Sequence, residues 1–576
     1  MLVLPRLSLY YPYMPSIVGK RHGKQTYYYL VESARVDGKP RIVDQQYLGS
    51  AEEVVARLEG GGAGEPDRSR HKAFGDVAAV WEMIDRLGVV GIVDDVVGAR
   101  RADAAASVGT YLALATLNRV VAPCSKLAFG DWWATTVGPR LLPGLPTAAT
   151  DHRRFWDAMD AVSPVDLVQI GRRITAHAVE VFRLEMSGLV LDMTNFATFI
   201  DSANTRAPIA QRGKAKQHRV DLRLVGLALV VTRDGGVPIL WHPYAGDRPD
   251  VTQFSGVLDG LVGRWRALGG DPDELTVTYD AGQNSTDNQI HLEGTGLGFI
   301  TSLPPSHHPD LLAVPAERFS VVDDDRFDGL TAYETTAAAY GFSHRTVVTH
   351  SPELHAAQVR GFAQTQAKAH RQLSELAARL ARGRTRKTTD GIQAEIDAIL
   401  RPRWLSRVID TELTGDTPAQ RRLTWRTDRD AHARLEDEIF GKRILFTNRD
   451  HWPQPEVIAG YRSQSDCEDG FRQLKDPHVV SFSPMHHWTE HKIGVHVFTC
   501  ALALQIAHLM RRHARQAGLD LSVRRLLAAL GGIQETVLLY QGDRGRPRAR
   551  RMITDLNATQ RRLYDIFDLD RYAPRR

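Results

Sequence analysis

The chain has 576 residues, with 73 Lys and Arg against 68 Asp and Glu, so its formal net charge is +5. The three cysteines lie far apart and form no CxxC pair, which argues against a structural zinc site or a disulfide framework. The N-terminus lacks the basic-then-apolar plan of a signal peptide, and the longest apolar run, 495–510, is too short to span a bilayer. We therefore expect a soluble cytoplasmic protein with no membrane partner, whose anionic partners must be inferred from local charge clusters.

Residues 1–59 are predicted to form a small β unit. TYYYLVES and PRIVDQQYL are rich in β-branched and aromatic residues, and Asp37–Gly38 between them indicates a hairpin turn. Basic residues at 20–24 stand beside three tyrosines, a combination that suits a nucleic-acid backbone. Protective charges on an edge hairpin are the alternative. A glycine-rich linker follows at 60–66.

Residues 73–185 are predicted to form a helical module. Apolar residues recur at intervals of three and four through this stretch, and Ser163–Pro164 is a favourable helix start. The module is a possible DNA-binding domain, although a purely structural role explains the same pattern.

An α/β core is predicted to begin at residue 186. A short apolar run ends on Asp192, strands follow at 222–232 and 236–244, and a helix follows at 250–268. A second apolar run ends on Asp280, and another strand covers 296–304. Three antiparallel strands, a helix and a further strand match the opening order of a ribonuclease H-like fold. In that fold Asp192 and Asp280 lie side by side at the ends of neighbouring strands.

A basic loop lies between the first aspartate and the second strand of this core. Its sequence, RGKAKQHR, contains Arg212, Lys214, Lys216 and Arg219. Close to a candidate catalytic acid, such a loop is suited to contacting phosphates, whereas a solvated charge run would carry no function.

A large insertion is predicted at 305–440, because 468 − 280 = 188 residues separate Asp280 from Glu468. Its first part contains short β-like runs. A long helix then starts at Ser351–Pro352 and ends at Gly383, and a second helix follows at about 390–400. The tract RGRTRK at 382–387 gives this helical hairpin a basic tip, able to reach along DNA or simply solvated. The core resumes at 441–517, and 518–576 is predicted to be a basic helical tail.

One polar helix is predicted over 455–475. At 100° per residue, one face presents an aromatic hydroxyl, an amide, a carboxylate and two cations. These belong to Tyr461, Gln464, Glu468, Arg472 and Lys475. Such a face can hold a metal ion and phosphates, although an ordinary amphipathic surface helix would have the same pattern.

These features together resemble the DDE transposases of bacterial insertion sequences, specifically the insertion-sequence-four group and its close relatives. Tyr461, Glu468 and Lys475 fall in register with the helix signature of that group, and Gln464 stands where the group has Arg. Further matches are LDMT around Asp192, YDAGQNS around Asp280 and the motif PYAGDRPD. The resemblance covers most of 14–515.

The resemblance implies that Asp192, Asp280 and Glu468 are catalytic carboxylates that hold two Mg²⁺ ions, with Mn²⁺ as a substitute. Asp192 would contact both ions, and the polar residues of the 455–475 helix would hold DNA phosphates near the cleaved end. The implied function is two-metal-ion cleavage at terminal inverted repeats and joining to target DNA. The protein would act as a homodimer on paired double-stranded DNA ends, associated with the nucleoid. An inactive DNA-binding descendant and a nuclease that only hydrolyses DNA remain alternatives.

Overall fold

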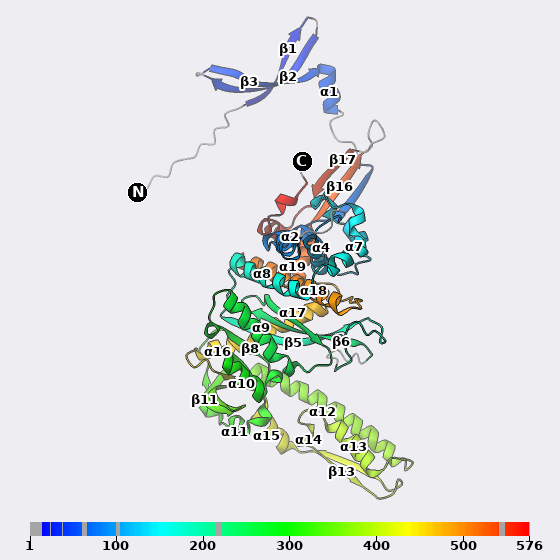
Figure 1. Cartoon of the computed structure of the whole chain (residues 1–576), viewed down its shortest axis with the longest axis vertical. Coiled ribbons are helices and arrows are strands. Elements are labelled where there is room, and N and C mark those ends of the chain that lie inside the picture. The colour runs from blue at the N-terminus through cyan, green and yellow to red at the C-terminus, as the bar shows by residue number, and fades with distance from the viewer. Residues whose placement is uncertain are drawn as a thin grey trace, which may run out of the picture. The chain divides into compact units, whose positions relative to one another are not determined.

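The computed structural model describes residues 14–23, 25–36, 39–59, 66–98, 104–214, 221–540 and 548–574 (Figure 1). The chain forms two compact units. The first contains Met1–Phe74, Ile533–Leu556 and Tyr572–Arg576, and the second contains Gly75–Gly532 and Asn557–Arg571. The five-segment domain division expected from the sequence stays a prediction.

The first unit contains two small antiparallel sheets. One consists of β1 (Met14–His22), β2 (Gln25–Val36) and β3 (Lys39–Ser50), and α1 (Ala51–Glu59) follows it. The pairing of β2 with β3 confirms the predicted hairpin, and β1 is an additional strand. The predicted glycine linker lies largely outside the described residues.

The second small sheet corrects the expectation of a helical tail. It has the order β17-β16-β4, formed by Arg548–Ile553, Gln534–Tyr540 and Arg68–Ala73. Ile533, Glu535 and Val537 are buried at alternate positions, and this period of two produces a strand. Within the described part of the predicted tail, the α-helices are α19 (Val523–Gly531) and α20 (Ala558–Ile566), both in the second unit.

The predicted helical module is confirmed as helical. Its helices are α2 (Gly75–Arg86), α3 (Val89–Val97), α4 (Val108–Val121), α5 (Phe129–Ala134), α6 (Gly138–Leu141), α7 (His152–Asp160) and α8 (Pro164–Phe182). Ser163 and Asp166 form a capping box at the start of α8, as expected for a Ser-Pro helix start.

The central feature of the second unit is a mixed sheet of nine strands in the order β10-β11-β12-β15-β9-β8-β5-β6-β7. Its first part in sequence is β5 (Gly188–Thr198), β6 (Arg223–Thr232), β7 (Pro238–Ala245), α9 (Phe254–Ala267), β8 (Thr276–Tyr279), α10 (Thr286–Thr295) and β9 (Gly298–Leu303). Strands β5, β6 and β7 are antiparallel neighbours, and β8 runs parallel to β5 and β9. The predicted order of strands and helix is thus confirmed.

The first part of the segment predicted as an insertion adds strands to this same sheet, and the second part lies outside the sheet. Strands β10 (Ser320–Val321), β11 (Thr331–Ala339) and β12 (Phe342–His350) follow α11 (Pro309–Leu312) and join the sheet through β15 (Lys442–Thr447). The rest forms an arm that projects from the sheet in Figure 1. The arm consists of α12 (Pro352–Ala381), α13 (Thr389–Leu400), α14 (Leu405–Val408), β13 (Ile409–Thr414), β14 (Arg422–Thr427) and α15 (Arg429–Ile439).

The single helix predicted over 455–475 is two helices, α16 (Gln454–Arg462) and α17 (Gln464–Lys475). At the junction the Ser463 hydroxyl donates to the Gly460 carbonyl at 2.6 Å, and the Ser465 hydroxyl donates to the Arg462 carbonyl at 3.1 Å. Serine hydroxyls that bond to the preceding turn compete with the helical ladder and bend helices. Tyr461 and Glu468 therefore belong to different helices, and a rotation of 100° per residue along one continuous helix does not relate their directions.

Helix α18 (Glu490–Gln516) is the long apolar helix of the second unit. It is long and apolar enough to cross a membrane, but 94% of its most apolar window is buried inside the protein. Its burial against α4, α17 and β7 is that of a core helix.

Candidate active site

Asp192 and Asp280 lie on neighbouring strands at the same level of the sheet. Strands β5 and β8 pair in parallel from Gly188 with Thr276 to Leu191 with Tyr279, so the next step sets Asp192 beside Asp280. Backbones of adjacent strands are about 4.8 Å apart. Asp192 is not at the end of its strand, as the sequence suggested, because β5 continues to Thr198 by pairing with β6. It is the first residue beyond the ladder with β8.

Tyr244, in the PYAGDRPD motif, lies close to Asp192. Its hydroxyl donates to Asp250 Oδ1 at 2.6 Å. Burial raises the pKa of Tyr244, and the carboxylates of Asp250 and Asp192 raise it further. A side chain at Gly226 of the intervening strand would overlap the Tyr244 ring, with its Cβ 2.1 Å from a ring carbon. The motif thus supplies two polar groups, absent from the predicted site, to the surroundings of Asp192.

Helix α17 packs against β5 and α18, and its buried residues are Cys467, Gly470, Phe471 and Leu474. Burial raises the pKa of the Cys467 thiol, and the nearby Asp192 carboxylate contributes to the increase. At the end of the helix, Lys475 Nζ donates to Thr194 Oγ1 at 2.8 Å and lies 5.7 Å from the centre of the Phe196 ring. Because Thr194 is two residues from Asp192, both side chains leave β5 on the same face. The structure therefore brings Lys475 to the side of the sheet that carries Asp192.

Glu468 is exposed on α17 and lines a cavity of about 480 Å³. The cavity lies between α16 and α17, β15 and the start of α12; Gln464, Arg443, Arg462 and Glu353 also line it. Across the described ranges, no three His, Cys, Asp or Glu side chains lie close enough together to hold one metal ion. The register makes the two aspartates neighbours, and in the described chain Glu468 does not join them in a group of three potential metal ligands.

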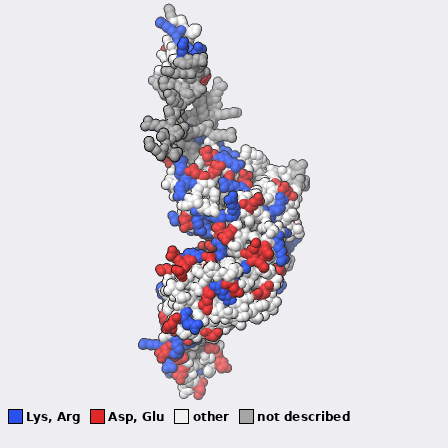
Figure 2. All heavy atoms as spheres, turned by 90° about the vertical axis from the view of Figure 1, so that its left-hand side faces the viewer, with Lys and Arg blue, Asp and Glu red and all other residues white. Residues whose placement is uncertain are grey.

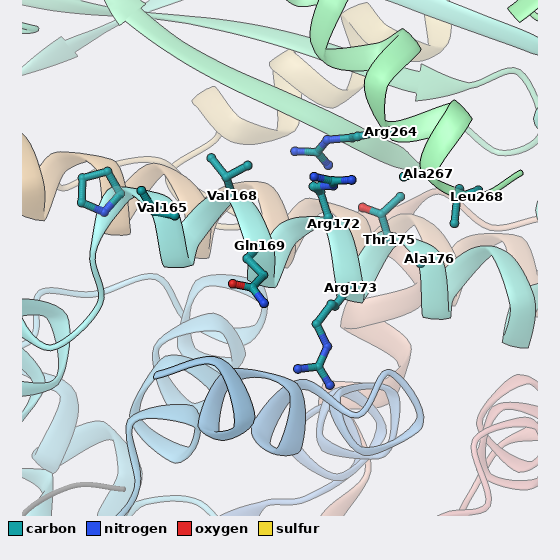
Figure 3. Close-up of a pocket in the computed structure, with 11 residues that line it drawn as sticks. Val165, Val168, Gln169, Arg172, Arg173, Thr175, Ala176, Arg264, Ala267 and Leu268 are labelled. Atoms are coloured by element: carbon teal, nitrogen blue, oxygen red, sulfur yellow. The ribbon is translucent and has the colours of Figure 1, made fainter. Parts of the chain in front are cut away.

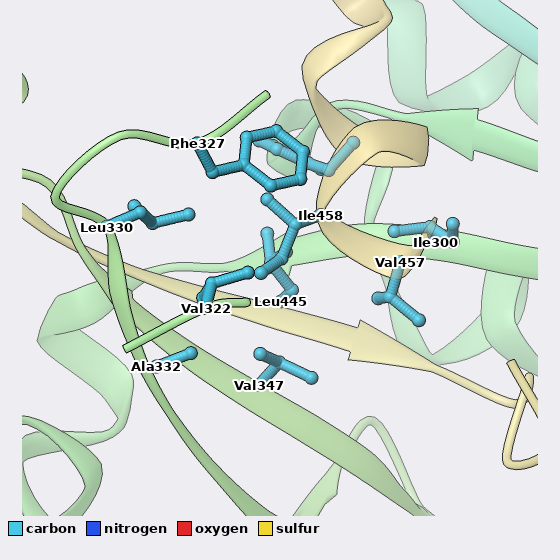
Figure 4. Packing of buried hydrophobic residues seen from close by; sticks show 10 residues of the cluster. Ile300, Val322, Phe327, Leu330, Ala332, Val347, Leu445, Val457 and Ile458 are labelled. Carbon is cyan, nitrogen blue, oxygen red and sulfur yellow. The ribbon is translucent and has the colours of Figure 1, made fainter. Parts of the chain in front are cut away.

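Tyr461 is a packing residue in this structure. It is 4% exposed and belongs to an apolar cluster with Ile300, Leu445 and Ile458 (Figure 4). Its hydroxyl donates to Ser302 Oγ at 2.9 Å, and burial is the main cause of its raised pKa. Continuing the β8–β9 register sets Ser302 beside Asp280, so the hydroxyl lies near that carboxylate. The sequence placed Tyr461 on an open polar face, whereas its ring forms a wall of the site.

The other predicted DNA contacts divide into two groups. Gln464 is half-buried in the cavity wall, and its Nε2 is buried with no hydrogen-bond partner in the described chain. Arg472 does not line the cavity: its side chain is 76% exposed and pairs with Asp469 at 2.9 Å. Arg472 therefore does not join Gln464, which stands where the transposase signature has Arg, in the cavity wall.

The basic loop is described only in its first part. Arg212 and Lys214 are exposed, and Asn195 Nδ2 donates to the Lys214 carbonyl at 3.0 Å, which holds this part of the loop against β5. Lys216 and Arg219 lie outside the described residues.

Arg443, Arg462 and Glu353 are cavity residues that the sequence did not indicate. Arg443 lies 5.3 Å from the centre of the Tyr461 ring, and Arg462 lies 4.8 Å from that of Phe327. Burial lowers the pKa of Arg462, Glu353 raises it and Arg443 lowers it, so the three charges lie close together. The only available signal was the position of Arg462 directly after the signature tyrosine.

A larger groove of about 740 Å³ lies between α8 and α9 (Figure 3). Arg172 and Arg264 lie side by side in it, among apolar residues such as Val165, Val168 and Leu268. None of the described residues that line this groove is a carboxylate, so it does not combine the acids and cations found around Glu468. On the face shown in Figure 2, Lys and Arg are interspersed with Asp and Glu over the described surface. Charge on that face therefore does not single out another site.

No family model and no curated protein matches the chain. Among solved structures, the chain is similar to the piggyBac transposase in its synaptic complex with hairpin DNA, determined by cryo-electron microscopy. The match has 8% sequence identity and a TM-score of 0.36, and covers 81% of this chain and 82% of that one.

Proposed function

We propose that this protein is a transposase of the DDE type, related to the insertion-sequence-four group and built on a ribonuclease H-like core. The observation that carries the proposal is the adjacency of Asp192 and Asp280 on parallel strands, with α17 packed beside them. This helix brings Glu468 and Lys475 to the same region of the sheet. Two adjacent carboxylates, a third acid and nearby cations are the groups that phosphodiester transfer requires.

The donor set fits a hard divalent cation. Mg²⁺ takes oxygen ligands and retains water, so the neighbouring carboxylates of Asp192 and Asp280 would suffice to hold it, with Glu468 as a further ligand. When bound, two such ions would activate an oxygen nucleophile and stabilise the leaving oxygen. Mn²⁺ offers a similar preference for oxygen ligands.

The protein's own cations have a separate role, which is to bind and orient DNA. Lys475 is held by Thr194 beside Asp192, and would contact a phosphate next to the scissile bond. Arg443 and Arg462 would contact phosphates in the Glu468 cavity, where the unpartnered amide of Gln464 offers a further donor. These residues take the place of the signature arginine that the chain lacks.

The test is a cleavage assay on DNA that carries the flanking ends of the protein's own gene, with Mg²⁺ or with a chelator. We expect metal-dependent nicking at the element boundary and a joined product with target DNA. Asp192→Asn and Glu468→Gln should each reduce nicking by on the order of 10³-fold or more while DNA binding persists. Asp469→Asn is the matched control, because it removes the adjacent exposed carboxylate, which pairs with Arg472.

Three outcomes would contradict the proposal in different ways. Nicking without a joined product would indicate a hydrolytic nuclease. Binding to the ends without nicking in any divalent ion would indicate an inactive descendant. Equal losses in Asp469→Asn and Glu468→Gln would remove Glu468 from the proposed site.

A further inference from the structure

The end of the arm carries a concentration of positive charge. The loop between α12 and α13, residues 382–387, has four Arg or Lys residues and no acid. Over 379–426, 11 Lys and Arg stand against 6 Asp and Glu, so 11 − 6 = +5, which equals the formal net charge of the entire chain. The distal part of the arm therefore carries a clear excess of positive charge.

Contacts with the β13–β14 turn hold this loop in place. Arg421, only 7% exposed, donates to the Lys387 carbonyl and, at 3.1 Å, to Thr389 Oγ1. Gly383 has a φ of 66° and lies against Ala419 of the same turn. The backbone of the tip is thus fixed by a buried guanidinium from another element.

Three arginines of the tip remain available to a ligand. Arg379 and Lys387 both pair with Glu395 of α13. Arg382, Arg384 and Arg386 are exposed, and none has an ion pair within the described chain. Three guanidinium groups on a fixed loop suit a ligand with regularly spaced negative charges, such as a nucleic-acid backbone.

The arm connects this tip to the candidate site. The first turns of α12, including Glu353, Leu354 and Ala357, line the cavity that contains Glu468. Helix α12 has 30 residues and, at 1.5 Å per residue, is about 45 Å long. At 3.4 Å per base pair, this distance corresponds to about 13 base pairs of duplex lying alongside it.

We propose that the arm tip, Arg382, Arg384 and Arg386, binds the phosphate backbone of duplex DNA about 13 base pairs from the cleavage position. The inference rests on the proposed function, because it places the cleaved phosphodiester near Glu468. Its contacts are to phosphates, so the tip contributes affinity and alignment of the duplex without reading its sequence.

The test compares two double variants of the full-length protein that change the net charge equally. Arg384→Gln with Arg386→Gln removes tip cations, whereas Arg407→Gln with Arg426→Gln removes arm cations that pair with Glu438 and Asp410. We expect only the tip variant to bind end DNA about 5- to 10-fold more weakly. The slope of log affinity against log salt should also become less steep by about 2 in that variant, because two phosphate contacts are lost. In the tip variant, hydroxyl-radical protection of the DNA should disappear about 13 base pairs from the cut and persist at the cut itself.

A DNA-length series makes the inference sharper. On DNA that ends fewer than about 10 base pairs from the cut, on the side that shows tip protection, the tip variant and the wild-type protein should bind equally. Equal affinity of both double variants on long DNA would overturn the tip contact, as would unchanged protection in the tip variant. Failure of the wild-type protein to nick its ends would instead count against the proposed function, because binding and protection are measured without cleavage.

Discussion

Helices α16 and α17 are consecutive in sequence and have different environments. α16 buries Val457, Ile458 and Tyr461 in an apolar cluster against β9 and β15. α17 buries a stripe that begins at Cys467 against β5, and presents Glu468 on its other side. The residues that the sequence combined into one functional face thus divide into a packing group and a chemical group, separated at Ser463.

The difference shows how a polar helix is positioned next to reacting groups. Apolar contacts of α16 fix the wall of the cavity, while the buried side of α17 sets the height of its exposed carboxylate above the sheet. Changes on the exposed side of α17 should therefore affect cleavage with little loss of stability, and changes in the buried residues of α16 should do the reverse.

Replacing Lys475 by Met should have the largest effect on cleavage. The ammonium is bonded to Thr194 on the face of β5 that carries Asp192, so its loss removes a positioned cation from the proposed site of developing negative charge. We expect the single-turnover cleavage rate to fall about 100-fold, with the melting temperature unchanged. Thr194→Val should cause a smaller fall, since the lysine persists without its partner.

Arg472→Met is the matched control for this prediction, because Arg472 is a cation of the same helix that pairs with Asp469 outside the cavity. We expect its cleavage rate to stay within about threefold of wild type, as for other exposed surface pairs. A loss equal to that of Lys475→Met would show that DNA contacts the outer side of α17, and the two cations of this helix would then not differ in function.

His508 supplies a pH test of the buried side of α17. Its ring lies between the Gly236 carbonyl, 2.5 Å from Nδ1, and Gln473 of α17, 3.2 Å from Nε2. Burial is the main cause that lowers its pKa from 6.5 to about 3. The unfolded chain therefore binds a proton first as pH falls below 6.5, and stability decreases from there down to about pH 3. At pH 5 this residue should account for a loss of about 2 kcal/mol relative to pH 7.

Urea unfolding of the wild type and of His508→Gln at pH 7 and pH 5 checks this expectation. His478→Gln is the control, because it changes an exposed histidine. The free energy of unfolding should fall less between the two pH values in His508→Gln than in wild type. A fall of the same size in both variants would assign the acid sensitivity to other groups, such as His487 and His496, whose pKa values burial also lowers.

The sequence predicted the parts of the fold that depend on local pattern. Apolar runs were sufficient for β5 to β8, and the runs ending near Asp192 and Asp280 located the two aspartates. The arm helix begins at Pro352 with Ser351 as its N-cap, as the Ser351–Pro352 pair indicated. These features depend on residues close together in the chain.

The features that were missed depend on competition or on distant residues. Serine hydroxyls at 463 and 465 end a helical pattern that periodicity alone continues. Arg443 and Glu353 reach the cavity from β15 and α12, and only the tertiary fold brings those elements together. The extension of the sheet by β10 to β12 likewise requires pairing with β15, about 100 residues further along the chain.

Tyr461→Phe should have the smallest effect and gives the most direct test of the α16 assignment. The ring and its packing remain, and only the hydrogen bond from the hydroxyl to Ser302 Oγ is lost. The free energy of unfolding should fall by about 1 kcal/mol, while affinity for end DNA and the cleavage rate stay within about twofold. A double-mutant cycle with Ser302→Ala should recover the interaction energy, because the two groups are direct partners. If stability were unchanged and DNA affinity fell tenfold, Tyr461 would hold a phosphate as the transposase resemblance implies, and α16 would belong to the chemical group together with α17.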